Sequence, residues 1–398
     1  MSALNHYCYH GKKNFRKGFR ALVAGGGTGD SLIYLGHQLS VTDAELVYLD
    51  LSEGSMEIAL RRVRCRGFEH KVTWLHGSLL DLPQMGLDPF DYINCSGVLH
   101  HLTDPPQGLA ALKSVLKDNG AIGIMLYGQY GRTGVYQMQE LMRLVNRDET
   151  DSYVCVQNTR STIDALPSSN WFKRSGGLSL LTGGQANDAE IFDMFMHVQD
   201  RAYTVPQLYE LVENAGLHLV DFTLDFRSLF KPAYVVQDPQ LLERIRRLPK
   251  RDQQTAAELL NGMITKHAFW VSHSAEPQID LSDPDNVPWF SRMAIGLKIP
   301  ESIRKIQEGD WVFKIRRNNS FELTLKIQPV PAAKRFIELI DEHRTLREIV
   351  DLIAAEYARR PSTDEVLKVC HHVMGVLRQC DSILLRHKSS PHLLKRSA

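Results

Sequence analysis

The chain has 398 residues, of which 43% are hydrophobic and 23% charged, and its formal net charge is +1. This length predicts two domains, one large and one small. The near-neutral net charge excludes a strong overall electrostatic field that would recruit nucleic acid or an anionic membrane. No apolar run is long enough to cross a bilayer and no secretion signal precedes the first strand, so we expect a cytoplasmic protein without a membrane partner.

The first third of the chain alternates strand-like and helix-like segments. Five apolar strands are predicted at 20–24, 46–50, 72–76, 90–96 and 121–127. Helices are predicted between them at 31–39, 55–66 and 106–116, the last ended by Asn119-Gly120. Strands that alternate with helices imply crossover connections and therefore a parallel, doubly wound sheet.

The pattern loosens after residue 127, where glycines punctuate a large insertion at about 128–200. Helices are predicted within it at 133–145 and 161–166. Regular elements then resume with a helix at 204–215, strands at 217–226 and 267–272, and helices at 241–248 and 253–263. Insertions near the carboxyl ends of strands usually shape a substrate pocket.

A proline- and aspartate-rich segment at 276–300 has the composition of a linker. Beyond it we predict a β-hairpin at 311–316 and 322–327, helices at 332–341, 346–357 and 363–379, and a last strand at 382–386. The predicted domains are 1–275 and 301–388, followed by a flexible tail at 389–398.

Six cysteines are scattered without a Cys-x-x-Cys pair and are expected to be reduced thiols. Cys370 and Cys380 lie near His371 and His372, but this spacing fits no standard zinc site. We therefore predict no metal ligands.

The most informative motif follows the first strand. Gly25-Gly-Gly-Thr-Gly29 precedes a helix, and the second strand ends in Asp50. Glycines allow a ligand to approach the backbone closely, and an ionised aspartate can accept two hydrogen bonds from a ribose diol. A dinucleotide would need the spacing GxGxxG, whereas here the third position after Gly27 is Asp30, an acid that would repel a pyrophosphate. This favours a nucleoside ligand with positive charge over NAD.

Several motifs together resemble class I S-adenosylmethionine-dependent methyltransferases. They are the glycine loop, Tyr48-Leu-Asp50, Asp81-Leu-Pro83, Phe90-Asp91 and Gly97-Val-Leu-His-His-Leu102. The resemblance is close over 20–126 and looser to about 275. It implies an α/β fold with a mostly parallel, seven-stranded Rossmann-like sheet, and S-adenosyl-L-methionine as the cofactor.

The resemblance also implies which residues bind the cofactor. The loop would hold the methionine and ribose portions, and Asp50 would bind both ribose hydroxyls, although capping of the next helix is the alternative, with Ser52 competing for that role. The full predicted set is Gly25, Gly26, Gly27, Thr28, Gly29, Asp50, Leu51, Ser78, Leu79, Ser96, Gly97 and Val98. Three departures from the family stand out: Val23 replaces an acid that orients the methionine ammonium, Ser78 replaces an adenine-binding Asp, and Gly26 stands where the family often has Cys.

Candidate acceptor-site residues follow the fourth and fifth strands. The predicted catalytic set is His100, Tyr127, Tyr130, Arg132 and His197. Arg132 could hold a substrate carboxylate in a bidentate fork. Packing alone is the alternative for His100 and His101, and loop structure alone for the glycine-rich run 127–134. Tyr7 and Tyr9 are expected either to close over the cofactor or to belong to a flexible tail.

The C-terminal part weakly resembles a small α+β winged-helix or PqqD-like module, which implies a partner protein or a homo-oligomer; nucleic acid is disfavoured. The predicted function is methyl transfer to a small molecule or to a peptide or protein side chain. The alternative is a non-catalytic S-adenosylmethionine-binding scaffold or sensor. A nucleic-acid methyltransferase is a third possibility, disfavoured because Ser96-Gly97-Val98 stands where an amino-methylation motif would be expected.

Overall fold

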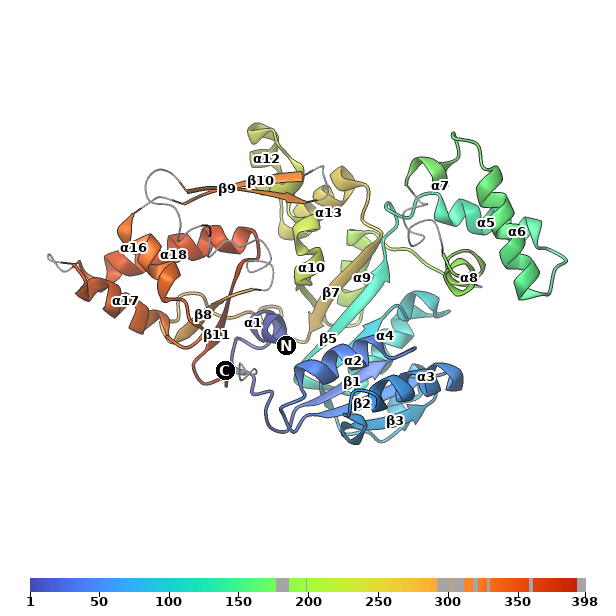
Figure 1. Cartoon of the computed structure of the whole chain (residues 1–398), viewed down its shortest axis with the longest axis horizontal. Helices are drawn as coiled ribbons and strands as arrows, with labels where there is room; N and C mark the ends of the chain where they lie inside the picture. The colour runs from blue at the N-terminus through green and yellow to red at the C-terminus, as the bar shows by residue number, and fades with distance from the viewer. Residues whose placement is uncertain are drawn as a thin grey trace.

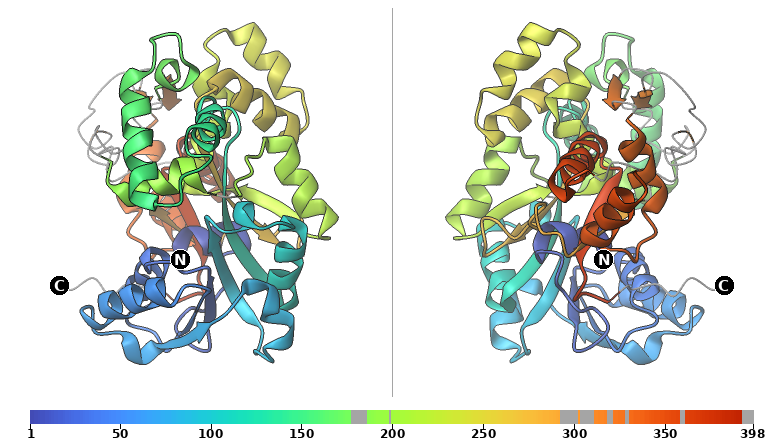
Figure 2. Two further views of the ribbon diagram at one scale, coloured as in Figure 1. Left: turned by 90° about the vertical axis from the view of Figure 1, so that its right-hand side faces the viewer. Right: turned by 90° about the vertical axis from the view of Figure 1, so that its left-hand side faces the viewer.

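The computed structural model describes residues 1–176, 186–197, 199–291, 302, 311–317, 321–327, 330–357 and 361–391. For 311–317 and 321–326 only the backbone is described. A seven-stranded sheet occupies the middle of the molecule, with a helical insertion at one end and the C-terminal helices at the other (Figure 1). In Figure 2 the helical insertion lies in front of the sheet in the left view, and the C-terminal helices lie in front of it in the right view.

The sheet has the order β3-β2-β1-β4-β5-β7-β6. Its strands are β1 (Arg20–Ala24), β2 (Glu45–Asp50), β3 (Val72–His76), β4 (Phe90–Ser96), β5 (Leu116–Tyr127), β6 (His218–Phe222) and β7 (Lys266–Ser272). The first five strands pair in parallel, and β7 runs antiparallel between β5 and β6. The predicted seven-stranded, mostly parallel, doubly wound sheet is confirmed.

Alternate residues of each strand enter two different cores, as the two-residue period of a strand requires. Leu22 and Ala24 pack with α4 (Pro105–Ser114) and α9 (Val205–Asn214) on one face. Ala21 and Val23 pack on the other face with α2 (Asp30–Gln38) and α3 (Glu53–Arg64). Both faces of β1 are therefore buried, which is why its sequence is continuously apolar.

Several element boundaries differ from the prediction. Helix α4 ends at Ser114 and β5 begins at Leu116, so Asn119-Gly120 lies inside a long strand and does not stop a helix. Strand β6 ends at Phe222, because the chain leaves the sheet at Thr223 to form α10 (Leu224–Arg227). The remaining elements of this region are η6 (Ser228–Phe230), α11 (Pro232–Val235), α12 (Pro239–Arg246) and α13 (Lys250–Asn261).

The insertion is a separate helical cluster with its own core. Its helices are α5 (Val135–Val145), α6 (Ser152–Ala165), α7 (Trp171–Arg174) and α8 (Asp188–Met196). Met138, Ile163, Phe172 and Phe195 meet at the centre of this cluster. Helix α6 is longer than the predicted 161–166, and the glycines at 177, 183 and 184 lie outside the described residues.

The C-terminal part combines helices with two pairs of strands. The elements are β8 (Asn286–Phe290), β9 (Trp311–Arg317), β10 (Phe321–Ile327), α16 (Pro331–Leu339), α17 (Leu346–Ala355), α18 (Thr363–Gln379) and β11 (Ile383–His387). The predicted hairpin forms from β9 and β10. The expected linker 276–300 instead contains β8, which pairs antiparallel with β11 because Val287 and Phe290 are buried beside that strand. Residues 292–300 lie outside the described part of the chain.

The first residues form a buried helix, α1 (Ser2–Cys8), between the sheet and β11. Tyr7 stacks on Trp270 with ring centroids 5.3 Å apart, and the Tyr9 hydroxyl donates to the Asp91 carbonyl at 2.6 Å. The Leu385 amide donates to His6 Nδ1 at 3.0 Å. Both expectations for this segment, a cover over the cofactor or a flexible tail, are therefore wrong.

The beginning of the predicted tail is also held in place. Ser390 is buried, and its hydroxyl accepts a hydrogen bond from the Asn5 side chain at 2.9 Å. The tail expected at 389–398 is thus ordered up to residue 391, and 392–398 lie outside the described residues.

A buried ionic network joins the sheet to the C-terminal part. Arg227 donates through Nε to Asp221 on β6 at 2.9 Å, and through Nη1 to Asp381, which precedes β11. Lys231 Nζ donates to both carboxylate oxygens of Asp381 at 2.9 Å. Although burial alone would raise it, the charges of Arg227 and Lys250 hold the pKa of Asp221 below its ordinary value. The network fixes these two parts of the molecule to each other.

Candidate functional site

The glycine loop turns at the carboxyl end of β1 and is held by its neighbours. The amides of Gly25 and Gly26 both donate to the Leu49 carbonyl, at 2.8 and 3.1 Å. Gly25, Gly27 and Gly29 have positive φ values of 70°, 50° and 96°. A Cβ at Gly26 would overlap the ring of Tyr48, and one at Gly25 would overlap Val98. The loop thus needs glycine both for its backbone and for its close packing.

Asp50 at the end of β2 points at this loop. Its Oδ2 accepts a hydrogen bond from the Gly27 amide at 2.7 Å, and its Oδ1 accepts one from the Ser52 amide at 2.8 Å. The N-cap of α3 is Ser52, whose hydroxyl accepts from the Ser55 amide, so the capping alternative for Asp50 is wrong. An ionised carboxylate retains lone pairs for further donors. The next side chain, Leu51, is 72% exposed and gives the site an apolar surface.

The loop after β4 reaches the glycine loop. Gly97 has a φ of 77°, and its amide donates to the Met125 carbonyl at 3.1 Å. Val98 lies directly against Gly25. The structure therefore brings together Gly25, Asp50 and Val98, the ends of three adjacent strands, as the sequence predicts.

Two of the departures from the family have clear structural positions. Val23 is buried on the face of β1 that packs against α1–α3, so its side chain lies in the core. Ser78 is the N-cap of η2 (Leu79–Gln84), and its hydroxyl accepts from the Leu80 amide at 3.2 Å. Leu79 is buried in the core with α4. Contact of Ser78 or Leu79 with an adenine stays a prediction.

Beyond Val98, aromatic and imidazole rings stack in a buried group. His100 lies on Tyr127 with centroids 4.0 Å apart, and His101 lies on His197 at 3.7 Å. The two adjacent histidines meet edge to face at 4.2 Å. The Arg132 guanidinium lies 3.8 Å from the centre of the Tyr127 ring. Four predicted acceptor-site residues therefore lie together: His100, Tyr127, Arg132 and His197.

The role expected for Arg132 needs correction. Its guanidinium donates to Asp200 Oδ2 at 3.4 Å, and only 6% of the residue is exposed. The same Asp200 oxygen accepts from Gln139 Nε2 at 3.1 Å. Arg132 is therefore engaged inside the protein and is not presented as a free carboxylate clamp. The carbonyl of Tyr130 accepts from Thr133, and a substrate role for Tyr130 stays a prediction.

Burial shifts the pKa values of His100, His101 and Tyr127 toward their neutral forms. Burial, with the charges of His101 and Arg132, lowers the pKa of His100 to about 3. Burial also lowers the pKa of His101 and raises that of Tyr127. His101 Nδ1 lies 2.9 Å from the Gln199 carbonyl, to which it can only donate, so its Nε2 has a free lone pair.

Sequence reasoning missed Asp200, Gln139 and Gln199. Asp200 lies three residues after the predicted His197, but its partner Arg132 is 68 residues away in the chain. The insertion brings them together, and no local pattern encodes that pairing.

The cysteines near His371 and His372 lie inside the protein. Cys370 and Cys380 are buried in the C-terminal core, and burial raises the pKa of both thiols. The Cys380 thiol donates to the Leu377 carbonyl at 3.2 Å.

Comparisons with known proteins find similarity to methyltransferases. The family model described as "Methyltransferase domain" matches residues 22–122. An uncharacterised protein of a Synechococcus strain is 33% identical over 270 residues, which are 67% of this chain and 63% of that protein. The tRNA 5-carboxymethoxyuridine methyltransferase of Escherichia coli K12 is 30% identical over 115 residues, 28% of this chain and 41% of that enzyme. The chain thus spans less than two thirds of the length of these curated relatives.

A solved structure matches nearly the whole fold. PKMT2 from Rickettsia typhi in complex with AdoHcy superimposes with a TM-score of 0.63 over 98% of this chain and 76% of that chain, at 12% identity. Residues 22–122 are thus similar to a methyltransferase domain, and the whole fold is similar to that of a protein solved with AdoHcy bound. These comparisons do not test the winged-helix or PqqD-like resemblance, which stays a prediction. None of the described helices is long and apolar enough to cross a membrane.

Proposed function

We propose that the chain transfers the methyl group of S-adenosylmethionine to a nucleophile on a small molecule or on a peptide or protein side chain. The observation that carries this proposal is the convergence of three strand ends. The Asp50 carboxylate is aimed by two backbone amides at a glycine loop that packs against Val98. A nucleoside fits this cradle because no side chain of the loop fills it, and a ribose diol suits a carboxylate that retains lone pairs.

The residues of this cradle suit the parts of the cofactor. Residues 25–29 would hold its methionine and ribose portions, and Asp50 the ribose hydroxyls. Thr28, Leu51, Ser78, Leu79 and Ser96 to Val98 would surround the rest. When bound, S-adenosylmethionine supplies an electrophilic methyl group on a sulfonium, so the protein mainly has to align the acceptor and exclude water.

The buried ring group suits the acceptor side. His100 stacks on Tyr127 and His101 stacks on His197, and together these rings would form a wall of the acceptor site. Arg132 would act indirectly there, by holding Tyr127 and Asp200 in place. Relatives of this chain are named for different acceptors, a tRNA 5-carboxymethoxyuridine and a demethylmenaquinone among them, so the acceptor has to be found by experiment.

The departures from the family favour a second candidate, a non-catalytic S-adenosylmethionine-binding scaffold. Val23 supplies no acid for the methionine ammonium, and Ser78 is occupied in capping η2. A scaffold of this kind would use the C-terminal part to bind a partner protein or a second copy of the chain. Incorporation of labelled methyl groups from S-adenosylmethionine into any component of a native extract would reject this candidate.

Titration calorimetry with S-adenosylmethionine and S-adenosylhomocysteine tests the proposal directly. Asp50→Ala removes two charge-assisted hydrogen bonds worth about 1.5–3 kcal/mol each, so affinity should fall by roughly two to four orders of magnitude. The exposed Glu53, on the first turn of α3, provides the matched control Glu53→Gln, which should bind normally. If wild-type protein binds neither ligand, or Asp50→Ala binds as well as wild type, the proposal is wrong.

A further inference from the structure

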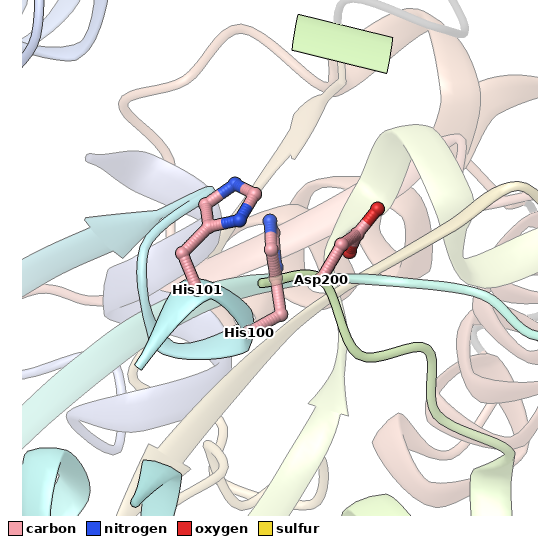
Figure 3. Close-up of side chains that lie close together, drawn as sticks. All are labelled: His100, His101 and Asp200. Carbon is pink, nitrogen blue, oxygen red and sulfur yellow. The ribbon is translucent and has the colours of Figure 1, made fainter. Parts of the chain in front are cut away.

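Three side chains of the acceptor-side group form a compact set of possible metal ligands. His100 and His101 belong to η3 (Leu99–His101), and Asp200 lies in the segment that leads into α9. One nitrogen or oxygen atom of each lies within 4.8 Å of the others. Figure 3 shows His100 standing between His101 and Asp200.

Two of these side chains have unused bonding capacity. His100 is fully buried, and neither of its ring nitrogens has a hydrogen-bond partner within the described part of the chain. Asp200 Oδ1 is likewise buried and unpaired among those residues. Leaving a buried polar group unsatisfied costs about 1–3 kcal/mol, and more when the group is charged. Such groups need a partner, and the described residues provide none for these atoms.

The hydrogen bonds to His101 and Asp200 are of the kind that orients metal ligands. The Gln199 carbonyl binds His101 Nδ1 at 2.9 Å, which leaves Nε2 free to coordinate. Gln139 and Arg132 bind Asp200 Oδ2, at 3.1 and 3.4 Å, and leave Oδ1 free. Metal-binding histidines almost always donate their second nitrogen to a carbonyl or carboxylate, and ligating carboxylates are hydrogen-bonded in turn.

We propose that His100, His101 and Asp200 bind a divalent transition-metal ion of the zinc type. Two imidazoles and one carboxylate are a ligand set typical of catalytic Zn²⁺ and related ions, and three protein ligands leave a coordination position open. The ligands His100 and His101 directly follow Val98, which contacts the glycine loop, so the metal site lies next to the proposed cofactor site.

The metal site specifies the acceptor class, an extension that rests on the proposed methyl transfer. A thiol or hydroxyl acceptor binds the metal through sulfur or oxygen and releases its proton to solvent. The lone pair of the resulting anion attacks the methyl carbon, and the bond from that carbon to the sulfonium breaks. The products are a methyl thioether or ether and neutral S-adenosylhomocysteine, so charge and atoms balance.

A second cluster in the chain provides the control. Asp283, Asp285 and His387 also lie within 4.8 Å of one another, but all three are partly exposed. Asp285 is already paired with Lys388 at 2.9 Å, and His387 Nε2 lies 3.7 Å from Asp283. These groups have partners and no unsatisfied buried atom among the described residues, so we expect no tight metal binding there.

The test is metal binding by the full chain after dialysis against a chelator. Zn²⁺ is titrated by calorimetry, and Co²⁺ reports coordination through its visible absorption. Loss of a residue that hydrogen-bonds a metal ligand costs roughly 10- to 100-fold in metal affinity, and Gln139→Leu should weaken Zn²⁺ binding by such a factor. His101→Gln removes a ligand itself and should weaken Zn²⁺ binding by more. Asp283→Asn should bind like wild type. Circular dichroism checks that each variant is folded, and Asp200→Asn replaces His101→Gln if that variant is not.

The outcomes separate this inference from the proposed function. Failure of wild type to bind Zn²⁺ or Co²⁺, or binding that persists unchanged in the folded ligand variant, overturns the metal site. Titration of S-adenosylhomocysteine into the same samples reports the cofactor site, which Asp50 governs independently. If the wild-type protein binds the metal but not S-adenosylhomocysteine, the proposed function is wrong. If it binds S-adenosylhomocysteine but no metal, only this inference is wrong.

Discussion

Acidification should loosen the contact between α1 and β11 through His6. This imidazole is almost completely buried, and its Nδ1 accepts the hydrogen bond from the Leu385 amide. Burial and the positive charge of Arg378 lower the pKa of His6 from 6.5 to about 3. The folded protein therefore keeps His6 neutral at a pH where the unfolded chain takes up a proton.

The sign and size of the effect follow from proton linkage. Between about pH 6.5 and 3 the unfolded state binds more protons, so the stability contributed by His6 is complete above pH 6.5 and is lost as the pH falls. At about pH 5.5 the unfolded histidine is ten-elevenths protonated and the folded one is not, which corresponds to about 1.4 kcal/mol of lost stability relative to pH 7.5. Other buried groups add their own pH dependence, so a variant is needed to isolate this one.

Urea unfolding of wild type and His6→Asn at about pH 7.5 and 5.5 provides the measurement. Asparagine places an amide oxygen near the position of Nδ1 and does not titrate. The free energy of unfolding should fall by about 1.4 kcal/mol less on acidification in the variant than in wild type. Equal losses in the two proteins would refute the assignment of a neutral, bonded His6.

Two further substitutions probe the glycine loop and the buried ionic network. Gly26→Ala should overlap the buried ring of Tyr48, displace the loop, cost about 1–3 kcal/mol of stability and weaken S-adenosylhomocysteine binding by calorimetry. Arg227→Met leaves Asp221 and Asp381 buried with less compensating charge and should cost about 3–5 kcal/mol in urea unfolding.

Each of these variants has a matched control. Gly54→Ala, on the neighbouring helix α3, meets no atom within 4 Å and should leave cofactor binding unchanged. Arg61→Met removes an exposed ion pair with Glu57, so its unfolding midpoint should stay close to that of wild type. Normal cofactor binding by Gly26→Ala, or equal stability of the two arginine variants, would contradict the packing described here.

The sheet could be predicted because its signals are local. Strand β1 has the predicted bounds, since a continuously apolar run followed by glycines marks a strand buried on both faces. Strand β8 was missed because its partner, β11, lies about a hundred residues further along the chain. The prolines around β8 resemble a linker, and only the pairing of Phe290 with Ile383 makes the segment a strand.

The cofactor side of the site could be predicted for the same reason, and the acceptor side only in part. Asp50 follows the glycine loop at a distance typical of the fold, and the structure joins the two by a hydrogen bond. The group around His100 depends on an insertion whose helices pack against one another, and no repeat or spacing in the sequence relates Arg132 to Asp200. The N-terminal helix was misjudged because its burial depends on contacts with β11.

The pairing of Asn5 with Ser390 has a consequence for biosynthesis. The two residues are 385 positions apart, so the ribosome needs roughly 20–80 s to make the second after the first. During that interval α1 has no β11 to pack against, and the apolar face that it shares with Trp270 stays incompletely covered. A nascent chain of this protein should therefore depend on chaperones until β11 emerges, even though its methyltransferase domain has been synthesised long before.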